Sequence, residues 1–255
     1  MTTGTQTPII EVRDLVLAYG TEPPIMRDLN FSVFPKEIFV IMGRSGCGKS
    51  TLLRHLIGLQ QARAGEIFLF GKNLQAADEA GRNALLRRMG VMYQGGALWS
   101  SMTVLENVML PLEEYTSLNL RERKEVANYK LALVGLEHAG NKYPSEISGG
   151  MAKRASIARA IALDPEILFF DEPGAGLDPI ASKELDDLLL NIRDALGTTM
   201  VIVTHELDSI FSVADRAVFL DTRTRTVGAV GAPKELRISA APHIRYFLSR
   251  AGTLK

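Results

Sequence analysis

A glycine-rich stretch near the N-terminus has the residue types and spacing that bind phosphate. It fits the pattern G-x-x-x-x-G-K-[ST] and runs Gly43, Arg44, Ser45, Gly46, Cys47, Gly48, Lys49, Ser50, Thr51. Glycines let backbone N–H groups approach phosphate oxygens, and a helix N-terminus adds partial positive charge. Lys49 suits the β- and γ-phosphates, and the Ser50 hydroxyl suits Mg²⁺. The stretch therefore predicts a nucleotide-phosphate site with Mg²⁺.

A second chemical element follows further along the chain, where the apolar run 167–170 ends in Asp171 and Glu172. Next to a phosphate-binding loop, the first carboxylate is placed to hold the Mg²⁺ shell. The second is placed to polarise an attacking water as a general base. Taken alone, the run would be an ordinary strand end before the turn at Pro173. Beside an intact phosphate loop, we interpret it as part of a hydrolytic site.

Several elements must position these residues. The run 37–42 predicts a buried strand that leads into the loop, and 52–57 predicts a helix after it. Alternating apolar residues predict a one-sided antiparallel sheet. Its expected strands are 9–12, 15–19, 31–34 and 66–70.

The rest of the chain predicts an α/β fold with a parallel sheet, because continuous apolar strands are separated by helical segments. The stretch 76–163 is expected to be mostly helical, and Asp178 is placed to cap a helix over 179–196. Further strands are expected at 167–170, 200–204 and 217–220, and a helical tail over 232–247.

Composition limits the classes of function. The chain has 255 residues, with 29 Lys and Arg against 29 Asp and Glu, so its formal net charge is zero. This balance argues against a partner held by its phosphates, such as nucleic acid. The one cysteine, Cys47, excludes an internal disulfide and is interpreted as a small filler of the loop. Without an apolar span or signal peptide, we expect a cytoplasmic protein that docks on a membrane only through a partner.

The segment Ser148-Gly149-Gly150-Met151, upstream of Asp171, resembles the LSGGQ signature of ATP-binding-cassette (ABC) ATPases. This resemblance covers nearly the whole chain and implies a P-loop NTPase fold. That fold has a RecA-like parallel core, an antiparallel β subdomain and a helical subdomain. It implies one ABC domain over 8–250, in which 8–75 and 164–230 form the β subdomain and core, 76–163 the helical subdomain and 231–255 a helical tail.

The resemblance also assigns roles. Tyr19 resembles the aromatic residue that stacks on adenine, Gln94 the Q-loop glutamine that touches Mg²⁺ and water, and His205 the switch histidine at the γ-phosphate. Gly176-Leu177-Asp178 resembles the D-loop, which couples two sites. Residues 148–151 would bind the ATP held by a second, head-to-tail copy, so the resemblance implies a homodimer.

Without that alignment, several of these residues would have plainer interpretations. A lone Ser-Gly-Gly is common in turns, Tyr19 would be a strand aromatic, and His205 a structural histidine. The remaining histidines, which we take as structural or surface residues without metal-ligand spacing, are His55, His138 and His243.

Departures from the general pattern narrow the resemblance. Met151 replaces the usual glutamine and is followed by Ala152-Lys153-Arg154, as in the ATPases of the Mla/MCE phospholipid transport systems. The segments 94–108, 111–112 and 242–248 are similar to the same group. This implies an integral-membrane permease, an MCE-domain protein and in some systems a STAS-domain subunit as partners. It also implies a place on the cytoplasmic face of a bacterial inner membrane. Lys36 stands where many relatives have glycine, and no function is attached to it.

The segment 94–108 also carries a cluster of apolar residues. It is either an internal packing element or a groove for a short helix of the permease, and we favour the groove. Its members are Leu98, Trp99, Met102, Val104 and Leu105.

Three alternatives share parts of this pattern. An ABC ATPase of an amino-acid, metal or drug transporter would keep all the chemistry and differ in partner, but Met151 and segment 94–108 argue against it. A soluble ABC protein acting on DNA or ribosomes usually has coiled-coil insertions or two cassettes, which are absent here. A non-catalytic cassette is disfavoured because Lys49, Asp171, Glu172 and His205 are all in place.

Overall fold

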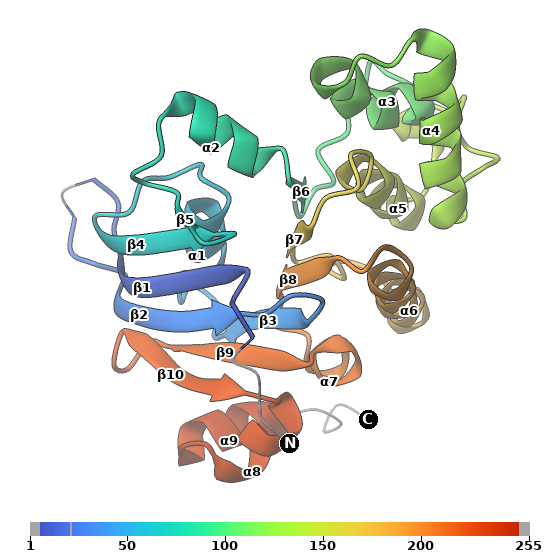
Figure 1. The fold of residues 1–255 in the computed structure, drawn as a ribbon. Helices are drawn as coiled ribbons and strands as arrows, with labels where there is room; N and C mark the ends of the chain where they lie inside the picture. Colours follow the sequence, from blue (N-terminus) through green and yellow to red (C-terminus); the bar gives the residue numbers. More distant parts are fainter. Residues whose placement is uncertain (1–5, 21, 250–255) are drawn as a thin grey trace. The chain divides into compact units, whose positions relative to one another are not determined.

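The computed structural model describes residues 6–20 and 22–249, which form two compact units. The first unit runs up to Leu86 and resumes at Thr199, and the second comprises Arg87–Thr198. Figure 1 labels the helices and strands of both. Over the described residues, no helix is both long and apolar enough to cross a membrane.

The first unit contains the predicted antiparallel sheet, with strand order β2-β1-β4-β5. The two early runs expected as separate strands lie in one strand, β1, whose register shifts between Val12 and Leu15. Between these residues Asp14 has a φ of 46°, so the chain kinks there without ending the strand. The bounds are β1 (Ile10–Leu17), β2 (Met26–Val33), β4 (Ala64–Leu69) and β5 (Lys72–Asn73).

Besides the antiparallel sheet, this unit contains a group of parallel strands. The fully buried strand β3 (Ile38–Gly43) lies between β8 (Thr199–Val203) and β9 (Arg216–Asp221) and is parallel to both. An unpredicted strand, β10 (Thr226–Gly231), pairs with β9 in the antiparallel sense. It contains two glycines, which weaken its strand signal in the sequence. Because parallel strands end at one edge, the residues that follow β3 and β8 emerge together.

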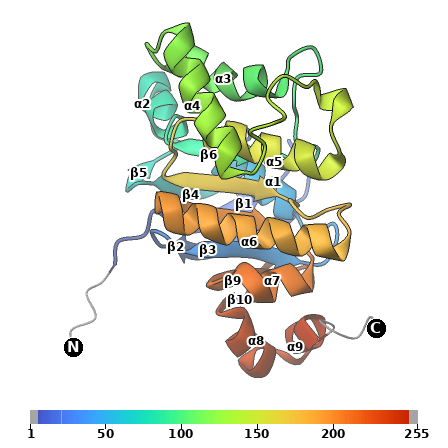
Figure 2. The same cartoon turned by 90° about the vertical axis from the view of Figure 1, so that its right-hand side faces the viewer.

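The helices of the first unit are α1 (Lys49–Leu56), α2 (Glu79–Leu86), α7 (Leu207–Val213), α8 (Pro233–Ser239) and α9 (Pro242–Ser249). The tail expected as one helical stretch is two helices, because the chain leaves the helical conformation before Pro242. Figures 1 and 2 show α8 and α9 side by side beyond β10. Helix α9 packs on β9 through the rings of Phe247 and Phe219, whose centroids are 5.2 Å apart.

The second unit combines a parallel strand pair with most of the helices of the middle region. Strand β6 (Met89–Met92), inside the stretch expected to be mostly helical, pairs in parallel with β7 (Ile167–Asp171). A Cβ at Gly90 would lie 2.1 Å from the carbonyl oxygen of Ala160, so glycine lets a helix pack directly on β6. The helices, several of them labelled in Figure 2, are α3 (Val104–Tyr115), α4 (Leu120–Leu133), α5 (Gly149–Ala160) and α6 (Pro179–Leu196).

Candidate functional site

The glycine-rich loop connects β3 to α1, as its sequence predicts. Gly43 ends β3 where no side chain fits: a Cβ there would lie 2.7 Å from Cys47 Sγ and 2.9 Å from the carbonyl oxygen of Leu220. Gly48 precedes α1 with a φ of 95°, a left-handed conformation that glycine adopts without steric cost. It makes no side-chain cap, so the first N–H groups of α1 are not used by a capping side chain. Such N–H groups, with the helix dipole, favour an anion.

The ammonium of Lys49 is held inside this loop. Lys49 is 8% exposed, and its Nζ donates to the carbonyl oxygens of Gly43 at 3.2 Å and Arg44 at 3.4 Å. The Lys49 ammonium thus binds the backbone of the same loop that would bind phosphate. A phosphate oxygen is a stronger acceptor than a carbonyl, so this arrangement suits exchange of these bonds for a ligand.

Tyr19 and His205 lie in the same unit as the loop. The Tyr19 hydroxyl is 2.8 Å from Thr51 Oγ1 on α1, while 44% of the residue is exposed, so one contact ties an accessible ring to the loop's helix. His205 follows β8 and is exposed. Because Val203 pairs with Ile41 in parallel register, His205 emerges at the same sheet edge as Gly43. The stacking and switch roles of these two residues stay predictions.

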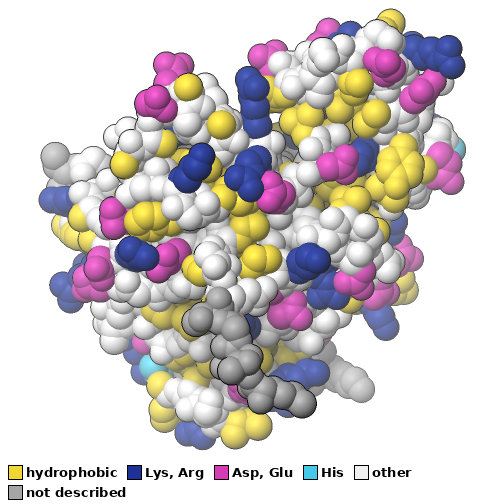
Figure 3. Space-filling view, in the orientation of Figure 1, with side chains coloured by type: hydrophobic (Ala, Val, Ile, Leu, Met, Phe, Trp, Pro, Cys, Tyr) yellow, Lys and Arg dark blue, Asp and Glu magenta, His cyan; other side chains and the backbone are white. Residues whose placement is uncertain are grey.

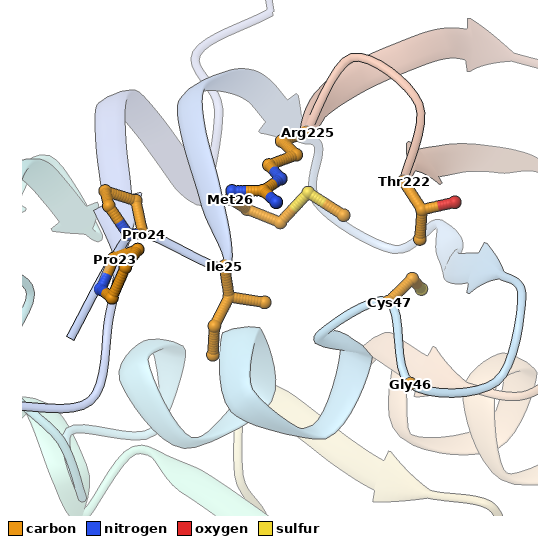
Figure 4. A pocket seen from close by; sticks show the side chains of 8 residues that line it. All are labelled: Pro23, Pro24, Ile25, Met26, Gly46, Cys47, Thr222 and Arg225. Atoms are coloured by element: carbon orange, nitrogen blue, oxygen red, sulfur yellow. The ribbon is translucent and has the colours of Figure 1, made fainter.

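A cavity of about 380 Å³ adjoins the middle of the loop. Gly46 and Cys47 form its loop side, and Pro23, Pro24, Ile25 and Met26 form an apolar wall. Thr222 and Arg225, from the turn between β9 and β10, complete it (Figure 4). The volume is in the range of small-ligand sites. The sequence assigned neither the wall nor the turn to the site, although Pro23 and Pro24 predict a turn.

The second unit carries the acidic pair and Gln94. Asp171 is the last residue of β7, and Glu172 follows it. Register pairs Met92 with Phe170, so Gln94, just beyond β6, emerges at the same edge as Asp171. Glu172 is 8% exposed and has a φ of 50°, which is unusual for a residue with a side chain. A strained backbone of this kind is typical of functional positions.

Two helix N-termini of the second unit match the remaining predicted motifs. Ser148 caps α5, and its Oγ accepts a hydrogen bond from the N–H of Met151 at 3.2 Å. A Cβ at Gly149 would meet nothing within 4 Å, so this end of the helix is open. Asp178 caps α6 and accepts from the N–H groups of Ile180 and Ala181 at 2.9 and 3.0 Å.

Helix α5 also supplies residues that the sequence did not assign to the site. Ser156 Oγ donates to the carbonyl oxygen of Gly96 at 2.9 Å, and Arg159 donates to Gly96 and Ala97. Burial lowers the pKa of Arg159. Lys153 Nζ donates to the carbonyl oxygens of Pro173, at 2.6 Å, and Ala175. One helix thus holds the loop after Gln94 and the loop after Glu172, a connection visible in the sequence only as basic residues on one helix.

The apolar cluster of segment 94–108 is only partly exposed. Val104 is fully buried, so its expected place on a docking surface is wrong and it packs inside the unit. Trp99 is 58% exposed. The side chain of buried Asn107 fixes the backbone of Trp99: it accepts from the Trp99 N–H and donates to the Trp99 carbonyl oxygen. Figure 3 shows hydrophobic side chains exposed over the region of α3 and α4. The large exposed hydrophobic residues of this unit include Trp99, Tyr115, Leu120, Tyr129 and Tyr143.

The other histidines have local partners or lie at the surface. Buried His55 has Nδ1 2.7 Å from the carbonyl oxygen of Thr51, and His243 Nε2 is 2.8 Å from Asp221 Oδ2. His138 is exposed. These contacts are those of structural residues.

The chain is similar to known proteins over most of its length. Residues 26–175 match the family described as ABC transporter. The chain is 38% identical over 240 residues, 94% of its length and 88% of the relative's, to the intermembrane phospholipid transport system ATP-binding protein MlaF of Escherichia coli K12. It is 36% identical, over 94% of its length and 66% of the relative's, to a probable ribonucleotide transport ATP-binding protein, mkl, of Mycobacterium bovis.

A solved structure has the same fold. It is the dimeric post-hydrolysis state of the ATP-binding cassette MJ0796 bound to ADP and Pi, with a TM-score of 0.77 and 28% sequence identity. The match covers 88% of this chain and 98% of that cassette.

Proposed function

The chain belongs to the ABC transporter family, and we propose that it is the ATP-hydrolysing subunit of a transporter that moves phospholipid between membranes. The protein is an ABC ATPase with the cassette fold, a parallel core with an antiparallel subdomain. In this proposal residues 8–250 act as one such domain. The similarity to a phospholipid-transport ATPase over nearly the whole chain carries the lipid assignment. Met151 in the signature and the segment 94–108 support it.

The residues of the first unit bind the nucleotide. The N–H groups of the loop 43–48 and the Lys49 ammonium hold the phosphates, because the loop presents donors and positive charge together. The exposed ring of Tyr19 stacks on the base. His205, at the carboxyl edge, contacts the γ-phosphate.

The residues of the second unit act on the terminal phosphate. Buried Glu172 accepts a proton from the attacking water as general base. Ser50 of the first unit, with Asp171 and Gln94, offers oxygen ligands of the hard type that Mg²⁺ prefers. Held by these residues, Mg²⁺ would supply positive charge that offsets the negative charge of the phosphates.

Two copies of the chain complete each site. The open N-terminus of α5, with Ser148, Gly149, Gly150 and Met151, binds the ATP held by the partner copy. Asp178, at the start of α6, couples the two sites. Dimerisation therefore depends on nucleotide.

The transporter also needs membrane partners. An integral-membrane permease docks on the exposed part of segment 94–108, where Trp99 is presented by a fixed backbone. An MCE-domain protein and, in some systems, a STAS-domain subunit complete the complex. The ATPase then lies on the cytoplasmic face of a bacterial inner membrane, and it binds no nucleic acid.

A second candidate is ribonucleotide transport, which the similarity to the mkl-type relatives favours. It shares the hydrolytic residues and differs in permease and cargo. An importer or exporter of amino acids, metals or drugs differs in the same way.

Purification of the intact complex tests the proposal. The tagged chain is extracted from membranes in mild detergent, and co-purifying proteins and small molecules are identified by mass spectrometry. A permease with an MCE-domain protein and bound phospholipid is the expected result. A different permease, with nucleotide cargo or a soluble binding protein, would refute the lipid assignment and leave the ATPase assignment intact.

A further inference from the structure

Arg225 lies beside the phosphate loop although no motif includes it. It belongs to the turn between β9 and β10 and lines the cavity formed by Gly46, Cys47 and the apolar wall. Figure 4 shows its guanidinium next to the side chain of Met26. We infer that Arg225 is a further nucleotide-binding residue, whose guanidinium contacts the phosphate chain of the bound nucleotide. The inference rests on nucleotide binding at the loop 43–51.

The position of Arg225 is fixed by its backbone. Its carbonyl oxygen accepts from the N–H of Arg27 at 2.8 Å, and the Thr226 hydroxyl donates to the carbonyl oxygen of Asp28 at 3.1 Å. These bonds tie the turn to the start of β2, the strand whose first residue, Met26, lines the same cavity. The side chain therefore starts from a defined point at the cavity wall.

The charge of Arg225 has no partner among the residues that the structure describes. No ion pair or hydrogen bond of its guanidinium is formed there, and its neighbours on the wall are apolar. A guanidinium carries five donors and binds phosphate in a bidentate manner. Arg225 is exposed, so its guanidinium is accessible to an anion in the cavity, and the loop next to it has the residues that hold phosphate.

The backbone of Arg225 gives an independent reason. Its φ is 56°, in the left-handed region that glycine occupies most easily. A side chain there carries a steric cost in the nucleotide-free protein. Strained residues of this kind are often retained where the side chain has a functional contact.

The volume and lining of the cavity suit a nucleotide. Its volume of about 380 Å³ is within the range of small-ligand pockets. Pro23, Pro24, Ile25 and Met26 offer an apolar surface for the sugar, while Gly46 and Cys47 belong to the phosphate loop. A cation between these surfaces would lie close to the phosphate chain of a nucleotide held by the loop.

Calorimetric titration of the full-length chain with ADP tests the inference. Arg225→Gln is expected to weaken ADP binding about three- to tenfold, since one charge-assisted contact is lost. Arg223→Gln is the matched control, because this exposed arginine is in the same turn and does not line the cavity. It removes the same charge and should change the affinity by less than about twofold.

Two further measurements separate the possible outcomes. Titration with adenosine should give the same affinity for Arg225→Gln and the unmodified chain, because the contact is to phosphate. Arg225→Gly should raise the melting temperature of the nucleotide-free protein while weakening ADP binding as the glutamine variant does.

Unchanged ADP affinity in Arg225→Gln, or an equal loss in Arg223→Gln, would overturn the inference. Lys49→Ala shows which assignment has failed. If it loses ADP binding while Arg225→Gln does not, only the role of Arg225 is wrong. If both variants bind normally, the phosphate loop itself is misassigned.

Discussion

Lys153 on α5 donates a hydrogen bond from its ammonium to the carbonyl oxygen of Pro173 at 2.6 Å, and a second one to that of Ala175. Pro173 directly follows Glu172, whose φ of 50° places it in a strained conformation. The helix that begins with the signature residues thus holds the loop that carries the proposed general base. A small displacement of this carboxylate would be costly for catalysis, because the position of a base relative to its water sets the rate.

Replacing Lys153 should therefore affect turnover more than binding. Lys153→Met removes two charge-assisted hydrogen bonds and should lower kcat about tenfold or more while leaving ADP affinity within about twofold. Lys153→Arg keeps the charge and donors and should recover most of the rate. Lys124→Met, an exposed lysine on α4, is the control and should be neutral. Equal kcat for Lys153→Met and the unmodified chain would exclude a positioning role.

Glu172 itself should separate binding from hydrolysis. Glu172→Gln removes the base but preserves shape, so ATP binding should persist while steady-state hydrolysis falls at least about a hundredfold. Glu166→Gln is a suitable control, because this carboxylate of the same unit pairs with Arg88 just before β7. Normal hydrolysis by Glu172→Gln would show that Glu172 is not the general base and that another group near the strand end serves.

Asp178 combines a structural and a functional role, and two substitutions separate them. Asp178→Ala removes the cap of α6 and should cost about 1 kcal/mol, or a few degrees of melting temperature for a chain of this size. Asparagine caps as well as aspartate, so Asp178→Asn should keep the melting temperature. Any loss of ATPase activity in the asparagine variant then reports the carboxylate. Equal melting temperatures for the alanine and unmodified proteins would contradict the capping role.

The local features of the fold could be predicted from the sequence. The phosphate loop lies between its strand and helix, and α6 begins and ends at the predicted residues with Asp178 as its cap. These features depend on residues near each other in the chain. Strand β6 was missed because it has only four residues and is stabilised by pairing with β7, more than seventy positions later. Without β6, the sequence offered no geometric reason to place Gln94 at the same edge as Asp171.

The contacts of α5 and the position of Arg225 at its cavity could not be predicted from the sequence. Lys153 and Arg159 bond to backbone carbonyls of loops that lie 20 or more residues away. Every residue has a backbone carbonyl group, so residue types do not indicate which carbonyl oxygens accept these bonds. Arg225 reaches its cavity through the unpredicted strand β10 and its turn.

Lys36 stands at a position where the resemblance implies glycine, and its backbone conformation offers a stability test. Its φ of 68° is left-handed, which is why glycine suits this position, and its N–H donates to Thr199 Oγ1 at 2.9 Å. Lys36→Gly keeps that bond and relieves a strain of about 1–2 kcal/mol, against about 0.5–1 kcal/mol for the greater freedom of glycine in the unfolded chain. The melting temperature should rise slightly with ATPase activity unchanged. A lower melting temperature would show that the exposed lysine makes a compensating contact.

Cys47 should resist alkylation in the folded protein, although it is a free thiol in the phosphate loop. It is 1% exposed, and burial raises its pKa despite the opposing charge of Lys49. A raised pKa means that less thiolate, the reactive form, is present at neutral pH. Iodoacetamide at pH 7.5 should therefore modify the folded chain at least about tenfold more slowly than the chain in urea, with Cys47→Ser as the labelling control.

Because Cys47 also lines the cavity assigned to the nucleotide, ADP should slow the reaction further. Equal rates in buffer and urea would show that the loop opens readily, and an unchanged rate with saturating ADP would place the nucleotide outside this cavity.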